Sequence, residues 1–78
     1  MITLHLLTFG PLSELIDAQD LCYAQELNSD SLKTLLESQY PALQGKRYVM
    51  SVNKKIIHQT ISLQDGDEVA LLPPFSGG

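Results

Sequence analysis

The sequence has few of the residues from which disulfide frameworks, nucleic-acid surfaces and membrane spans are built. It has one cysteine and no tryptophan, and 5 basic residues face 9 acidic residues, for a net charge of -4. One cysteine excludes a disulfide scaffold. The acidic balance argues against a nucleic-acid partner, because binding a phosphate backbone requires positive charge. No apolar run approaches the about 20 residues that span a bilayer, and residues 1–5 lack the cationic region of a secretory signal. We expect a soluble, cytoplasmic protein.

The chain is long enough for one domain with a single modest core. It has 78 residues, of which 44% are hydrophobic and 18% charged, a globular composition. The last six residues carry almost nothing that a core could use. We therefore predict a domain over residues 1–72 and a flexible C-terminal tail over residues 73–78.

Apolar alternation and helical spacing predict the elements of the domain. In the first strand Ile2, Leu4 and Leu6 point to one face of a sheet and the intervening residues to the other. Residues 28–31 offer side-chain oxygens that cap the main helix, which should end near Gln39 because Pro41 follows. The predicted strands are 2–9, 21–27, 48–53, 56–57 and 68–72, and the predicted helices are 11–17 and the main helix, which begins within residues 28–31 and ends near residue 39. One amphipathic helix can cover only one face of such a sheet, so the fold class is an α+β two-layer sandwich.

The side chains that usually carry catalysis or bind metal are sparse. Two histidines and one cysteine cannot build a closed zinc site, which requires four ligands, and the glycines do not have phosphate-binding spacing. Cys22 with His5 or His58 would make a thiolate pair only with a pocket and an orienting group. We favour Cys22 as a small apolar strand residue, His5 as a surface or partner-facing imidazole, and His58 as a loop residue.

A group of carboxylates surrounds Gly66. Asp65, Asp67 and Glu68 have the oxygen chemistry of a cation site, but their spacing around a glycine is typical of a capped turn. We favour the turn, and predict no metal.

The sequence ends in Leu71-Leu72-Pro73-Pro74-Phe75-Ser76-Gly77-Gly78. The prolines stiffen a segment that leaves the sheet, and the two glycines have no side chain. Six extended residues reach at most about 20 Å, so the Gly78 carboxylate can enter another protein's narrow active site. The alternative is a frayed end, but frayed ends tend to be polar and unpatterned, whereas Phe75 supplies an apolar anchor.

These residues resemble a known family. The stretch LQDGDEVA at residues 63–70, followed by PPFSGG, closely resembles the C-terminus of the small, sulfur-carrier subunits of molybdopterin synthase, of the ThiS and MoaD type. The resemblance extends over the whole chain: its length, a first strand ending in Phe9, Glu14-Leu15 in a short helix, the main helix, and Val52-Asn53 before the fourth strand. It implies a ubiquitin-like β-grasp fold, a mixed sheet covered by one main helix, with an extended diglycine tail.

The resemblance also implies a function in molybdenum cofactor biosynthesis. An adenylating enzyme that uses ATP and magnesium joins the Gly78 carboxylate to AMP, and a sulfur donor displaces AMP to leave a thiocarboxylate. The tail then inserts into the large catalytic subunit, where its sulfur is transferred to precursor Z. The chain is then a substrate and not an enzyme on its own, it binds no cofactor, and the expected assembly is a heterotetramer of two large and two small subunits.

The resemblance assigns roles to particular residues. Gly78 carries the reacting carbon, and the tail that enters the partner channel comprises Pro73, Pro74, Phe75, Ser76 and Gly77. A Cβ at either terminal glycine would clash with a channel that admits backbone alone. We predict an apolar partner-binding patch at the base of the tail, formed by Leu7, Phe9, Leu71 and Leu72, although some of these residues fit a core equally well.

Two departures from the family pattern and two alternatives remain. The family often has two aromatic residues where Leu71-Leu72 stands, and a polar stretch ending in arginine where residues 10–13 stand, so contacts with partners should differ. One alternative is a carrier for thiazole synthesis or tRNA thiolation, which usually lacks the two prolines. The other is a non-covalent ubiquitin-like interaction module whose tail is never activated.

Overall fold

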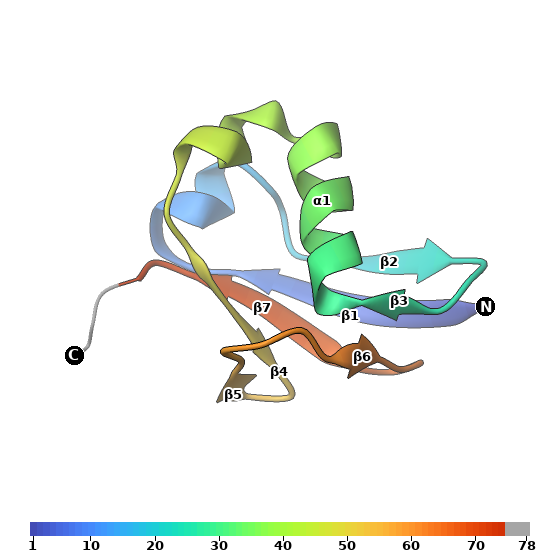
Figure 1. Ribbon diagram of the computed structural model, residues 1–78. Helices are drawn as coiled ribbons and strands as arrows, with labels where there is room; N and C mark the ends of the chain where they lie inside the picture. Colours follow the sequence, from blue (N-terminus) through green and yellow to red (C-terminus); the bar gives the residue numbers. More distant parts are fainter. Residues whose placement is uncertain (75–78) are drawn as a thin grey trace.

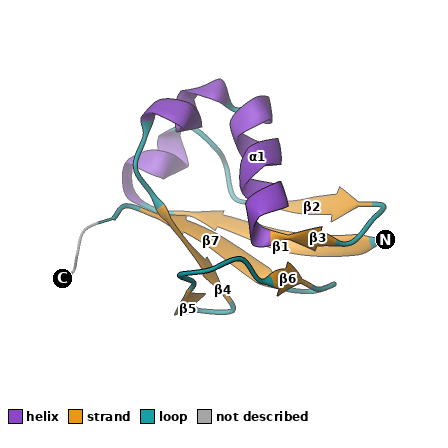
Figure 2. Cartoon of the chain, viewed as in Figure 1, coloured by secondary structure: helices purple, strands orange, loops and turns teal. Residues whose placement is uncertain are grey.

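The computed structural model describes residues 1–74, which form two layers. A five-stranded sheet carries the helices on one face, with strand order β2-β1-β7-β4-β5 (Figures 1 and 2). The elements are β1 (Ile2–Thr8), η1 (Gly10–Glu14), β2 (Gln19–Tyr23), β3 (Leu27–Asn28), α1 (Ser29–Gln39), η2 (Pro41–Gly45), β4 (Val49–Val52), β5 (Lys55–Ile56), β6 (Ser62–Leu63) and β7 (Glu68–Leu72). The α+β prediction, with one main helix over a mixed sheet, is confirmed.

The last strand of the sheet lies at its centre. β7 pairs in parallel with β1 and antiparallel with β4, while β1 also pairs antiparallel with β2. Because side chains alternate along a strand, every second residue of β7 faces the helical layer. Because β7 has a neighbour on both sides, the chain leaves the sheet from a strand that is held by two ladders of hydrogen bonds.

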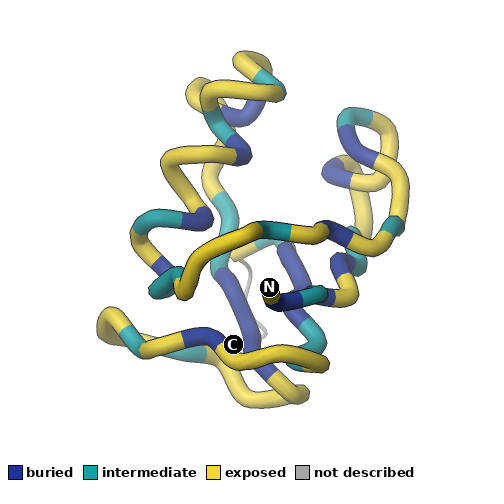
Figure 3. Tube along the Cα trace, turned by 90° about the vertical axis from the view of Figure 1, so that its right-hand side faces the viewer, coloured by how far each residue is buried: buried dark blue, intermediate teal, exposed yellow. Residues whose placement is uncertain are grey.

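The core lies between the sheet and the helices. Ile2, Leu4 and Leu6 of β1 are buried, as the alternation predicts, and they meet Leu32 and Leu36 of α1. Figure 3 shows buried stretches on the central strands and on the side of the helix that faces them. The helical spacing of the α1 leucines thus gives the sheet a single covering layer.

The main helix has the predicted ends. Asn28 is its N-cap, and the Oδ1 atom of Asn28 accepts a hydrogen bond of 2.8 Å from the backbone N–H of Ser31. The helix ends at Gln39, and Pro41 begins the 3-10 helix η2. The cap satisfies one of the free N–H groups of the first turn. At the other end, Pro41 disfavours helical geometry at the residue before it, so the helix gains no further turn.

Three predicted elements differ from the structure. The strand predicted over 21–27 is wrong, because β2 ends at Tyr23 and Leu27 belongs to β3, which pairs with Leu63 of β6 in a separate two-stranded sheet. Alternating half-buried residues look the same in one strand as in two strands separated by a bend. The short helix is a 3-10 helix that ends at Glu14, and β5 is one residue earlier than expected. None of the helices in the described part is long and apolar enough to cross a membrane.

Candidate functional site: the base of the C-terminal tail

The point at which the chain leaves the sheet is closely held. The register pairs Leu71 with Thr8 of β1 and with Met50 of β4. The backbone N–H of Phe9 donates to the Leu71 carbonyl oxygen at 3.1 Å, which continues the ladder beyond the end of β1. Pro73 is partly buried and Pro74 is exposed. The two prolines thus start from a fixed point at the sheet.

The two leucines before the prolines have opposite environments. Leu71 is 0% exposed and lies in the core, so its predicted place in a partner-binding surface is wrong. The reason is register: Leu71 shares its row with Met50, whose side chain also belongs to the core. Leu72, one residue later, therefore faces the side of the sheet that the helices leave open.

Apolar side chains gather on that open face beside the tail. The register aligns Leu7 with Ala70, Ala70 with Ser51, and Ser51 with Ile56, so one row crosses four strands on a single face. We call the apolar residues here the tail-base patch: Leu7, Phe9, Ile56, Ala70 and Leu72. Together with Ser51, Lys54 and Glu68 they line a depression of about 390 Å³.

The tail-base patch is open to solvent in the chain as it stands. Phe9 is 46% exposed and Ile56 is 52% exposed, while Ala70 and Ser51 form a buried floor. Sequence reasoning named Leu7, Phe9 and Leu72 but missed Ile56. The signal was present, because two consecutive isoleucines in a strand must point to opposite faces. An apolar depression of this kind is suited to contact with another protein.

The rest of the open face is polar. Nδ1 of His5 lies 2.7 Å from Oδ1 of Asp20, which is the register partner of His5 on β2. The hydrogen bond that the ring donates to Asp20, together with the negative charge of Asp20, raises the pKa of the His5 imidazole above its ordinary value. His5 is half exposed, as predicted for a surface imidazole. The open face of the sheet is therefore polar around His5 and Asp20 and apolar at the tail-base patch.

Cys22 is exposed and was expected to behave as a small apolar strand residue. Its Sγ atom lies 3.6 Å from Oγ1 of Thr3, its register partner. The ring of His5 bonds to Asp20 instead, and His58 lies in a loop, as predicted. The geometry of the described residues therefore does not assemble a thiolate pair around Cys22.

The carboxylates near Gly66 form the capped turn that the sequence predicts. Oδ1 of Asp65 accepts from the backbone N–H of Thr3 at 2.7 Å, and Oδ2 of Asp67 accepts from the N–H of Gln64 at 2.8 Å. Gly66 has a φ of +89°, which suits glycine. Backbone groups thus use the carboxylate oxygens, and this end of β7 is fixed by one bond within the turn and one to β1.

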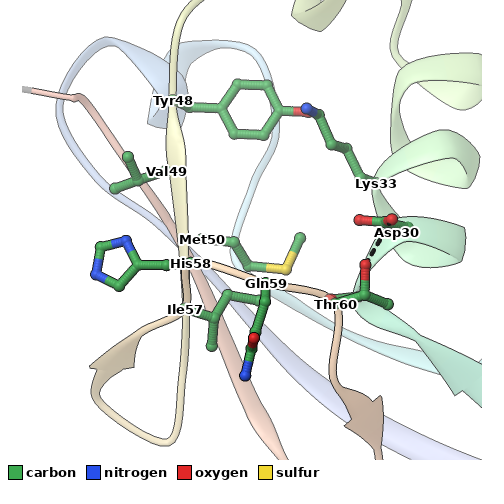
Figure 4. Close-up of a pocket in the computed structure, with 10 residues that line it drawn as sticks. Asp30, Lys33, Tyr48, Val49, Met50, Ile57, His58, Gln59 and Thr60 are labelled. Carbon is green, nitrogen blue, oxygen red and sulfur yellow. Dashed lines mark hydrogen bonds between the residues drawn. The ribbon is translucent and has the colours of Figure 1, made fainter.

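A second depression lies away from the tail, between α1 and the segment after β5 (Figure 4). Its volume is about 380 Å³, and none of its lining residues belongs to β7. Asp30 accepts a hydrogen bond from Thr60 across it at 2.6 Å, and Lys33 lies 5.6 Å from the centre of the Tyr48 ring. Burial and the hydrogen bond to Glu37 raise the pKa of Tyr48. These contacts join α1 to the residue before β4 and to the loop after β5, a structural role.

Part of the predicted site falls outside the described residues. Phe75, Ser76, Gly77 and Gly78 lie beyond residue 74, so the structure bears only on the base of the tail. The described base comprises Pro73, Pro74 and the tail-base patch.

Comparisons with known proteins place the chain. The family model described as ThiS matches residues 6–78. A Mycobacterium tuberculosis protein named molybdopterin synthase sulfur carrier subunit is 34% identical over 83 residues, a match that covers 100% of both chains.

Solved structures share the fold. A putative molybdopterin converting factor subunit 1 from Pyrococcus furiosus matches with a TM-score of 0.85 at 15% identity, covering 96% of this chain and 100% of that one. SAMP1 from Haloferax volcanii matches with a TM-score of 0.76 at 20% identity, covering 97% of this chain and 99% of that one. A chain in a complex of subunits 1 and 2 of the molybdopterin-converting factor from Helicobacter pylori matches with a TM-score of 0.75 at 22% identity, covering 99% of this chain and 100% of that one. These likenesses bear out the ubiquitin-like β-grasp fold, and the sequence match over nearly the whole length shows that the chain belongs to the ThiS family.

Proposed function

We propose that this chain is the sulfur carrier subunit of a molybdopterin synthase. The observation that carries the proposal is the identity of 34% to a protein of that name, over the full length of both chains. The described structure supports it, because the chain enters its predicted tail from a central strand beside an exposed apolar patch. The domain then serves to bind partner proteins, and the chemistry takes place at the tail.

The reacting group of the proposal is the carboxyl group of Gly78. A C-terminal carboxyl has a pKa of about 3.5, so it is ionised at neutral pH and is a poor electrophile. An activating enzyme with ATP and magnesium therefore has to act first. A carboxylate oxygen attacks the α-phosphorus, pyrophosphate leaves, and the acyl-adenylate forms.

Sulfur then replaces the AMP. A donor at the oxidation level of sulfide attacks the acyl carbon, AMP leaves with the bonding pair, and a thiocarboxylate remains. In the large catalytic subunit this sulfur is transferred to precursor Z, and water restores the carboxylate. The chain supplies the reacting carboxyl group and a surface that its partners bind, and the catalytic groups belong to those partners.

The tail-base patch is the proposed docking surface for the large subunit. Phe9 and Ile56 are about half exposed and surround a buried floor, the arrangement of an apolar interface centre. Lys54 and Glu68 lie at the edge of the same depression and supply charges of both signs. A partner that covers this patch sits next to Pro73, so its active site can receive the tail. Two such pairs would form the heterotetramer.

Intact-mass spectrometry tests the proposal directly. After incubation with the activating enzyme, ATP, magnesium and a sulfide source, the chain should gain the mass of one oxygen-to-sulfur replacement. The control is a chain that lacks Gly78, which should keep its mass because its terminus no longer reaches the activating site. An unchanged mass of the full chain, with an activating enzyme that thiolates a known carrier, would reject the proposal.

A second assay separates the carrier from its alternatives. The thiocarboxylated chain, mixed with the large subunit and precursor Z, should yield molybdopterin. A carrier for thiazole synthesis or tRNA thiolation would gain sulfur but fail in this mixture. A non-covalent module would gain no sulfur at all. The reaction belongs in the cytoplasm, in keeping with the free thiol of Cys22.

A further inference from the structure

We propose that Gly10 is a positioning residue for the tail, because the absence of its Cβ provides the space in which the Pro73 ring sits. A Cβ built on Gly10 would lie 2.9 Å from Cγ and 3.6 Å from Cδ of Pro73. Cβ atoms essentially never approach another heavy atom within 3.0 Å. Any other L-residue at this position must therefore displace either the turn at Gly10 or the proline. This inference rests on the proposed function, in which the direction of the tail matters.

The turn at Gly10 is held more firmly than the proline. The Gly10 carbonyl accepts a hydrogen bond of 2.8 Å from Oγ of Ser13. The N–H of Leu12 donates to the Phe9 carbonyl at 3.2 Å, and the side chain of Leu12 is buried in the core. Moving the Gly10 backbone would break these contacts and expose Leu12. The cheaper response is for Pro73 to move.

A displaced Pro73 changes the direction of everything that follows it. Leu71 is fixed by its hydrogen bond from Phe9, and Leu72 is paired with Val49. The pucker of the ring gives Cγ a small freedom of its own, but the φ angle of proline is locked, so any further displacement moves the ring and the chain after it together. That part of the displacement is passed on to the tail.

The direction of the tail should affect the chemical step more than the binding of the domain. The folded surface of the domain, the tail-base patch included, stays intact when Pro73 moves, so the activating enzyme and the large subunit still dock. The fraction of docked chains whose terminus reaches the reacting position falls, and a misplacement of about 1 Å can cost about 100-fold in rate. Loss of kcat with an unchanged KM is the signature of such positioning. A merely destabilised domain would instead raise the apparent KM, because less of it would be folded.

The experiment compares Gly10→Ala with Gly66→Ala in acyl-adenylate formation by the activating enzyme. Both glycines have a positive φ, +59° and +89°, but a Cβ at Gly66 meets nothing within 4 Å. Gly66→Ala thus carries backbone strain without the clash. We expect Gly10→Ala to lower kcat by about tenfold or more with KM within about twofold, and Gly66→Ala to leave kcat unchanged. If Gly10→Ala does not fold, Gly10→Asn keeps the Cβ and tolerates the left-handed conformation.

Pro73→Ala supplies the rescue. It removes the Cγ and Cδ atoms that a Cβ on Gly10 would meet, so adding Gly10→Ala to Pro73→Ala should lower kcat no further. An equal loss of kcat in Gly66→Ala, or a loss from Gly10→Ala that persists without the proline ring, would overturn the inference.

A structural readout keeps this inference separable from the proposed function. If the wild-type chain is never adenylated, the proposed function fails while NMR still reports on the contact. Nuclear Overhauser effects between the Gly10 α-protons and the Pro73 ring should be present in the wild type, and their relative intensities should change in Gly10→Ala because the ring lies in a different place. Unchanged contacts between Pro73 and residue 10 in the variant would show that the ring does not depend on the missing Cβ.

Discussion

Replacing Leu71 by alanine should destabilise the domain, whereas the same change at Leu72 should not. Leu71 is 0% exposed and packs into the core, so the change leaves a cavity as well as losing buried apolar surface. Such substitutions cost about 3–5 kcal/mol. A domain of this length is stabilised by about 4–12 kcal/mol in total. The variant should therefore melt about 12 °C or more below the wild type.

Leu72→Ala is the matched control, one residue along the same strand. Leu72 is only partly buried on the open face, so its free energy of unfolding should fall by about 1 kcal/mol or less. It should instead weaken binding of the large subunit by about tenfold. Urea unfolding followed by circular dichroism measures the first effect, and titration calorimetry the second. Equal destabilisation by the two variants, or a stable Leu71→Ala, would refute the assigned faces of β7.

Two further predictions concern single hydrogen bonds. Asp20→Asn should lower the pKa of His5 toward its ordinary 6.5, followed by NMR titration of the imidazole. Because the pKa of His5 is raised in the folded state, the stability from this pair is present below pH 6.5 and is lost as the pH rises through the folded pKa. A difference in unfolding free energy between wild type and variant that grows at alkaline pH would contradict this. Asn28→Ala should cost about 1 kcal/mol in urea unfolding through loss of the cap on Ser31, while Asn28→Asp should cost little, and equal losses would argue against a capping role.

The faces of the first strand could be predicted from the sequence because alternation survives in a half-buried sheet. Ile2, Leu4 and Leu6 are buried, and His5 is exposed as expected. The capped helix start and the turn at Gly66 were also predictable, because each depends on residues close in the sequence. Local chemistry decides these elements, and local chemistry is what a sequence displays.

The environment of Leu71 and Leu72 could not be predicted in the same way. Both strand residues are leucines, so the pattern does not show which of them faces the core. Their assignment depends on the register with Thr8 and Met50, which are distant in sequence. The contact between Gly10 and Pro73 is of the same kind, since it joins positions that only the folded sheet brings together.

The topology explains why a domain that presents a tail would place it after a central strand. Leu71 is held on one side by β1 and on the other by β4, and Leu72 is paired with Val49 of β4. Edge strands such as β5 can separate from the sheet locally, at a small fraction of the total unfolding free energy. A tail that followed an edge strand would change direction each time that strand frayed. After β7, the last residue held by both ladders, Leu71, can shift only when both of them open, which requires the core around Leu71 to unfold. The position from which the tail starts, at Leu71, is thus as stable as the domain itself.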